Sequence, residues 1–160
     1  MVLTFYILLN IAVLLFFFRY QKRNIHVLEV ITYWLVATIL FQNYTALFYM
    51  NFKYFLIPDI LSLELANLMN RTILFPLLAI LFLNRYIVLT TIKEKTLWLV
   101  CYTVILSSME GLGDRLGILI HTHWKIGWSF SFWLFFLLAL MGFMSYFRKK
   151  LNHGVPANEL

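Results

Sequence analysis

The 160-residue chain has little charge and far more apolar surface than a soluble domain of its size. Asp, Glu, Lys and Arg make up 12% of it, about half the share in a soluble domain, whereas hydrophobic residues make up 62%. A chain this short leaves much of its surface exposed when it folds, so it cannot hide that much apolar surface from water. The composition excludes an ordinary water-soluble domain and indicates lipid as the solvent.

Cysteine is almost absent, because Cys101 is the only one and lies in an apolar run. Within one chain this excludes an intramolecular disulfide, a CxxC redox pair and a four-cysteine zinc site. The chain also lacks the G-x-S-x-G elbow of hydrolases, the H-E-x-x-H helix of zinc proteases and a nucleotide-binding loop. It shows no internal repeat, and no segment between the apolar runs is long enough to form a soluble domain.

Five apolar runs are long enough to cross a bilayer, which takes about 20 residues. We expect a single transmembrane domain over residues 1–160, in which Pro58-Asp59 signals the start of the third span and the last ten residues form a polar tail. The predicted fold is an all-α integral membrane protein, a bundle of five transmembrane helices. The predicted spans are 2–18, 27–50, 60–83, 96–119 and 128–147.

The basic residues predict how the chain crosses the cell membrane. No cation precedes the first run and three follow it, the reverse of a cleaved signal peptide, so we expect a retained span with its N-terminus outside and the C-terminus inside. Nine Lys and Arg then lie inside and four lie outside or in outer helix ends, the bias of the positive-inside rule. The net charge of +6 thus reflects membrane topology, and we expect no nucleic-acid partner. The inner set is Arg19, Lys22, Arg23, Arg85, Lys93, Lys95, Arg148, Lys149 and Lys150.

Polar residues within the third run lie on one helix face. Glu64, Asn67 and Arg71 are spaced i, i+3 and i+7, and a charge at the centre of a membrane helix costs at least about 2.5–3.5 kcal/mol, so each needs a partner or a purpose. In the same run Pro76 cannot donate a hydrogen bond to the carbonyl of Thr72, which predicts a kink there.

Counting along the third and fourth runs places opposite charges at matched heights. Arg71 stands about 18 Å and Glu110 about 21 Å from the inner ends of their runs, at 1.5 Å per residue. We therefore predict an ion pair between Arg71 and Glu110, and a weaker second pair between Glu64 and Arg115. The alternative is that these side chains reach the outer headgroups.

The stretch from Glu110 to Trp128 gathers polar residues at the outer interface. Its glycines weaken a helix, so the fourth span either continues to about residue 119 or breaks at these glycines. His121 and His123 offer metal ligands together with Glu110 or Asp114. Titration near neutral pH and simple loop packing are the alternatives, and because no fixed third ligand is evident we predict no metal, no catalytic group and no cofactor.

The second half of the chain, about residues 58–150, resembles a family of short, uncharacterised multipass membrane proteins of spore-forming Gram-positive bacteria. The resemblance rests on Phe75-Pro76, on Glu110 with Gly117 seven positions later, on His121-Thr-His-Trp124, on Trp128-Ser129 and on the basic end at Arg148. Arg71 and Asp114 depart from the family's pattern. The resemblance implies a membrane location and a fold, and a role in the physiology of spore-formers such as spore formation or germination, but no reaction.

Three classes of function fit the sequence. The first is a non-enzymatic accessory protein that binds a ligand, a membrane-protein partner or a second copy of itself in an outward-facing polar cluster. The second is a small oligomeric transporter or channel component, for which intramembrane charge and a Pro-kinked helix are suited. The third is a membrane enzyme acting on a lipid or an outer-face substrate. The predicted binding residues are Glu64, Asn67, Arg71, Glu110, Asp114, Arg115, His121, His123 and Trp124.

Overall fold

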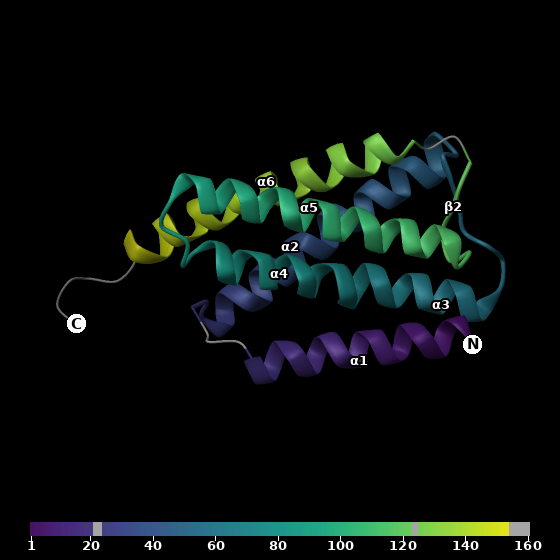
Figure 1. The fold of residues 1–160 in the computed structure, drawn as a ribbon, viewed down its shortest axis with the longest axis horizontal. Helices are drawn as coiled ribbons and strands as arrows, with labels where there is room; N and C mark the ends of the chain where they lie inside the picture. Colours follow the sequence, from purple (N-terminus) through teal and green to yellow (C-terminus); the bar gives the residue numbers. More distant parts are fainter. Residues whose placement is uncertain (21–23, 123–124, 154–160) are drawn as a thin grey trace.

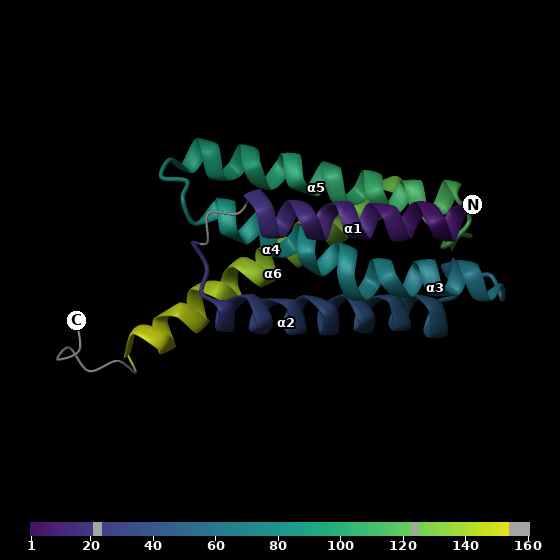
Figure 2. The same cartoon turned by 90° about the horizontal axis from the view of Figure 1, so that it is seen from below.

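The computed structural model describes residues 1–20, 24–122 and 125–153, and nearly all of them are helical (Figure 1). Met1 and the last turns of α6 lie at opposite ends of the bundle, which we call the N-terminal end and the C-terminal end (Figures 1 and 2). The elements are α1 (Val2–Tyr20), α2 (Val27–Ala46), η1 (Leu47–Asn51), β1 (Phe55–Leu56), α3 (Leu61–Met69), η2 (Asn70–Leu74), α4 (Phe75–Tyr86), α5 (Ile92–Arg115), β2 (Ile120–His121) and α6 (Ile126–His153), where η1 and η2 are π-helical.

Five helical segments are long and apolar enough to cross a membrane, which confirms the all-α, five-helix prediction at that level. They are Val2–Arg19, Val27–Asn51, Leu61–Tyr86, Ile92–Arg115 and Gly127–Leu151. Four of them match the predicted ranges closely at their starts. The fourth differs, since it begins and ends four residues earlier than predicted.

Local capping explains the bounds of α5. Thr91 and Glu94 form a capping box, in which each side chain accepts a hydrogen bond from the other residue's backbone N–H, and this fixes the start at Ile92. At the other end Gly117 adopts φ +73°, and the N–H of Ile118 donates to the carbonyl of Gly113. This is a Schellman cap with glycine in the left-handed position, so α5 stops at Arg115.

The third apolar segment, α3–η2–α4, forms the centre of the bundle. Of its most apolar stretch 61% is buried, against 11–28% in the other four segments. The helix α4 packs against α1, α2, α5 and α6, and its side chains from Phe75 to Ile80 are all buried. The polar face predicted on this segment therefore looks into the protein as well as toward its surface.

The carbonyl released by Pro76 finds a partner on a neighbouring helix. Pro76 has no N–H to donate to Thr72, and the chain widens into the π-helical turn η2 just before it. The indole Nε1–H of Trp34 on α2 donates to the Thr72 carbonyl oxygen at 2.7 Å. The predicted disturbance of this helix is a widened turn, and Trp34 ties that turn to α2.

A two-residue antiparallel ladder joins two loops at the N-terminal end. Phe55 of β1 pairs with His121 of β2, and Leu56 pairs with Ile120. Thr122 adds hydrogen bonds from its hydroxyl to the carbonyl oxygens of residues 53 and 54. The sequence analysis predicted no strand here, because two paired residues leave no alternating pattern to read.

An ion pair at the C-terminal end fastens α6 to α2. Arg148 Nε donates to Glu29 Oε1 at 2.6 Å, and its Nη2 donates to Glu29 Oε2 at 3.2 Å. The Tyr33 hydroxyl and the backbone N–H of His26 also donate to this buried carboxylate. Four donors thus compensate a buried charge whose desolvation alone costs several kcal/mol.

We expect Trp34→Phe to lower the free energy of unfolding by about 1–3 kcal/mol, because it leaves the Thr72 carbonyl without a donor. In a Pro76→Ala background the alanine restores an N–H that can donate to Thr72, so the same Trp34→Phe substitution will cost less. Unfolding in lipid bicelles measures both. Equal losses in the two backgrounds would show that Trp34 does not compensate for Pro76.

Candidate functional site

A buried carboxylate, Glu110, lies at the centre of the N-terminal half of the bundle. Its side chain carries an acid but is only 4% exposed, within the apolar helix α5. Its Oε2 accepts a hydrogen bond from the indole Nε1–H of Trp133 on α6 at 2.6 Å. Its Oε1 lies 3.2 Å from Nε2 of His121 on β2. One carboxylate thus connects α5, α6 and the loop that carries β2.

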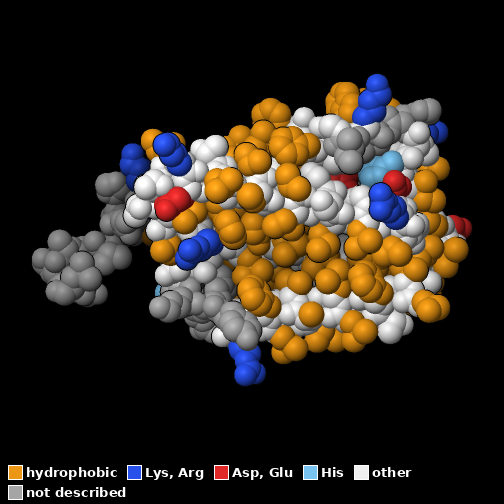
Figure 3. Space-filling view, viewed as in Figure 1, with side chains coloured by type: hydrophobic (Ala, Val, Ile, Leu, Met, Phe, Trp, Pro, Cys, Tyr) orange, Lys and Arg blue, Asp and Glu red, His pale blue; other side chains and the backbone are white. Residues whose placement is uncertain are grey.

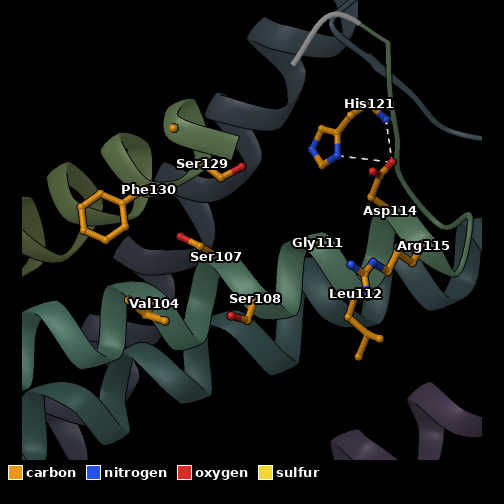
Figure 4. A pocket seen from close by; sticks show the side chains of 11 residues that line it. Val104, Ser107, Ser108, Gly111, Leu112, Asp114, Arg115, His121, Ser129 and Phe130 are labelled. Atoms are coloured by element: carbon orange, nitrogen blue, oxygen red, sulfur yellow. Dashed lines mark hydrogen bonds and ion pairs between the residues drawn. The ribbon is translucent and has the colours of Figure 1, made fainter. Parts of the chain in front are cut away.

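His121 is held between two acidic side chains. Its Nε2 faces Glu110, its Nδ1 lies 3.3 Å from Asp114 Oδ1, and its backbone N–H donates to that same oxygen at 2.9 Å. The edge of its ring meets the ring of Phe55 at a centroid distance of 5.0 Å. Figure 4 shows the imidazole beside Asp114, with the backbone of β2 behind it.

The cap of α5 explains why these groups converge. Asp114 lies in the last turn of the helix, and the left-handed Gly117 reverses the chain so that β2 returns over that turn. The pairing of β2 with β1 then fixes the position of His121. A substitution at Gly117 that disfavours φ +73° would displace His121 from both carboxylates.

The two carboxylates favour the protonated imidazole. Burial on its own lowers the pKa of His121, but the hydrogen bond and charge of Glu110, followed by those of Asp114, outweigh it and raise the pKa above its ordinary value. A protonated imidazole has an N–H on both ring nitrogens and so can donate to both acids. The site is therefore a triad in which one imidazole lies between two carboxylates.

A large groove opens beside this triad. It lies between α5 and α6, in the parts of both helices that are nearer the N-terminal end of the bundle. Its volume is about 700 Å³. Figure 4 shows Ser107, Asp114, Arg115 and His121 around the space, with Ser129 on the facing helix. The remaining lining residues are Val104, Ser108, Gly111, Leu112, Gly127 and Phe130.

Several predicted binding residues meet at this end, but not in the predicted pairs. Glu110, Asp114 and His121 form the triad, and Arg115 lines the groove. Asn67 and Arg71 line a smaller cavity together with Glu110. Glu64 is exposed at the start of α3. The predicted His123 and Trp124 lie outside the described residues.

The predicted direct ion pairs are wrong. Within the described part of the chain, no carboxylate lies within ion-pair distance of Arg71 or Arg115. The oxygens of Glu110 are engaged by Trp133 and His121 instead. Heights along two helices follow from counting residues, but the direction in which each side chain points depends on helix packing, which the counting did not include.

Sequence reasoning missed Trp133 and the Glu29–Arg148 pair. Trp133 sits in an apolar run and is fully buried, and a buried indole N–H usually finds an acceptor, but nothing in the sequence identifies which acceptor that is. Glu29 and Arg148 are 119 residues apart in sequence, so no local pattern connects them.

The described residues contain no group of three or more His, Cys, Asp or Glu side chains that could hold a metal ion. The two ring nitrogens of His121 point at different carboxylates and do not converge with them on one point. The arrangement can bind charge and exchange a proton, and the groove beside it offers room for a ligand.

Comparison with known proteins gives no match to a protein-family model, to a curated protein or to a solved structure. The class that the fold defines is a five-helix, all-α protein with helices suited to a membrane, and its function has to be argued from the site.

We expect the stability of the protein to fall as pH rises above about 6.5. The pKa of His121 is raised in the folded state, so its stabilisation is fully present below the unfolded pKa of about 6.5 and is lost as pH rises through the folded pKa. His121→Gln should reduce this fall, because the variant has no imidazole whose pKa is raised by folding. The measurement is the free energy of unfolding against pH for both proteins, and parallel curves would contradict it.

Proposed function

We propose that the chain is a multipass protein of the cell membrane with its N-terminal end outside. Seven described cations lie toward the C-terminal end, namely Arg19, Arg85, Lys93, Lys95, Arg148, Lys149 and Lys150. Lys53, Arg115 and Lys125 lie at the N-terminal end. A broad apolar surface separates the two ends, and the blue side chains lie toward both ends of it (Figure 3). The positive-inside rule then supports this orientation.

We further propose that the protein binds an amphipathic molecule from the outer leaflet in the groove between α5 and α6, without transforming it. The observation that supports this is the groove, whose volume of about 700 Å³ falls within the range of small-molecule sites. Val104 and Arg115 line it eleven residues apart on α5, a rise of about 16 Å. The lining thus passes from apolar to charged over the distance that separates acyl chains from headgroups.

Charge at the upper end of the groove favours an anionic headgroup. The carboxylate of Asp114 already contacts His121, both through the ring and through the backbone. Arg115 is exposed and has no ion pair with a described residue. A guanidinium binds phosphate oxygens bidentately, so a phosphate-bearing amphiphile fits the groove better than a neutral one.

Binding is better supported than catalysis at this site. Ser107 and Ser108 line the groove and are the nearest candidates for a nucleophile. A serine needs a base to accept its proton, and His121 is the obvious one. Both ring nitrogens of His121 face carboxylates instead, which favours binding over catalysis.

The test fills the groove at a position where the fold tolerates a side chain. A Cβ added at Gly111, which lines the groove, meets no atom within 4 Å, and the same holds at Gly142 on α6, outside the groove. We expect Gly111→Phe to reduce retention of co-purified phospholipid about tenfold, a loss of about 1.4 kcal/mol. Gly142→Phe is the matched control and should retain lipid as the wild type does.

Native mass spectrometry of protein released from nanodiscs measures the bound lipid. Equal retention by the two phenylalanine variants would contradict the proposal. If Gly111→Phe instead changes the oligomeric state and leaves lipid retention unaltered, the groove receives a helix of another protein chain and the lipid proposal is wrong.

A further inference from the structure

A second cavity lies on the opposite face of α5 from the groove. It measures about 20 Å³ and is lined by Glu110 and Gly113 of α5, whereas Val104, Gly111 and Arg115 line the groove. At about 100° per residue these two sets of positions centre roughly 150° apart on the helix. Glu110 therefore has the small cavity beside it and, through His121, a contact with the groove.

Three polar side chains from one face of the third apolar segment line this small cavity. They are Asn67, Asn70 and Arg71, spaced i, i+3 and i+4. Asn67 is 4% and Asn70 is 3% exposed. The atoms Asn67 Nδ2, Asn70 Oδ1 and Arg71 Nε are buried and have no hydrogen-bond partner among the described residues. Each such atom destabilises the fold when it is left unpaired.

The start of η2 concentrates these groups. Asn70 and Arg71 are its first two residues, and a π-helical turn adds a residue to the helix circumference. Such turns recur at functional sites. Here the turn lies immediately before Pro76 and is tied to α2 by the indole of Trp34, so its shape is fixed from outside the cavity.

The chemistry of the lining identifies the ligand. Asn67 Nδ2 and Arg71 Nε are donors, whereas Asn70 Oδ1 and the carboxylate of Glu110 are acceptors. A bare anion would satisfy only the donors, and a bare cation only the acceptors. Water both donates and accepts, and it needs about 10–15 Å³ of space and two to four polar partners.

We propose that one ordered water molecule binds in this cavity, with Asn67, Asn70 and Arg71 as its partners and Glu110 beside it. Through this water the guanidinium of Arg71 is linked by hydrogen bonds to the carboxylate of Glu110, with which it makes no direct ion pair. The charges of Arg71 and Glu110 then compensate each other through water. The site is independent of lipid binding, because it lies on the other face of α5.

Crystals grown in a lipidic mesophase containing bromide test the identity of the ligand. The expected result is density for a single light atom, within about 3.2 Å of at least two of the three unpartnered atoms, without anomalous scattering. An anomalous bromide peak would replace water with an anion and overturn the proposal. A cavity without density would overturn it as well.

A matched pair of glycine variants tests the same site in a bilayer. A Cβ at Gly113 lies 3.3 Å from Ile118 and takes space from the cavity, whereas a Cβ at Gly111 meets nothing within 4 Å. In water-edited solid-state NMR, we expect rapid magnetisation transfer from water to the side-chain amide of Asn67 in the wild type and in Gly111→Ala. Gly113→Ala should lose it.

The exposed Asn51 provides the reference signal in every spectrum. If Gly113→Ala does not fold, the wild type and Gly111→Ala still decide the matter. Slow transfer to Asn67 in both proteins, with rapid transfer to Asn51, would contradict the presence of an internal water. Rapid transfer that survives in a folded Gly113→Ala would place the water elsewhere and would equally contradict it.

Discussion

The carboxylate of Glu110 is the interaction on which the N-terminal half of this protein depends. Removing a carboxylate from water costs several kcal/mol, so its oxygens must find donors. Trp133 supplies one from α6 and His121 supplies the other from β2. Because those donors belong to different elements, satisfying one buried charge also sets where α6 and the β1–β2 pair lie relative to α5. The groove between α5 and α6 takes its shape from this arrangement.

Much of the fold could be predicted from the sequence, because the apolar runs are long and polar or basic residues clearly separate them. The start of α5 was placed four residues late, since hydropathy alone passes over the polar capping box of Thr91 and Glu94. For its end, residue 119 was one predicted alternative and a break at the glycines was the other; the helix ends at Arg115, with Gly117 at a positive φ. The site was predicted by residue but not by pairing. Glu110 and Arg71 stand at similar heights, yet the partners of Glu110 come from an indole in an apolar run and from a two-residue strand, neither of which leaves a sequence pattern.

The two faces of α5 line two different spaces. One face lines an open groove, and the other closes a small polar cavity against Asn67, Asn70 and Arg71. In lipid, helices are held together by packing and by polar contacts rather than by release of water. The indole of Trp34 holds η2 against α2, and the triad of Glu110, His121 and Asp114 holds β2 against α5.

The central claim is that Glu110 and His121 stabilise the protein through each other. A double-mutant cycle tests it most directly, with Glu110→Gln, His121→Gln and the double variant unfolded in bicelles at about pH 6, where the imidazole is protonated. Our account predicts a coupling free energy of about 1.5–3 kcal/mol, the range for hydrogen bonds in which a partner is charged. Losses that add within about 0.3–0.5 kcal/mol would contradict it, because the two side chains would then act independently.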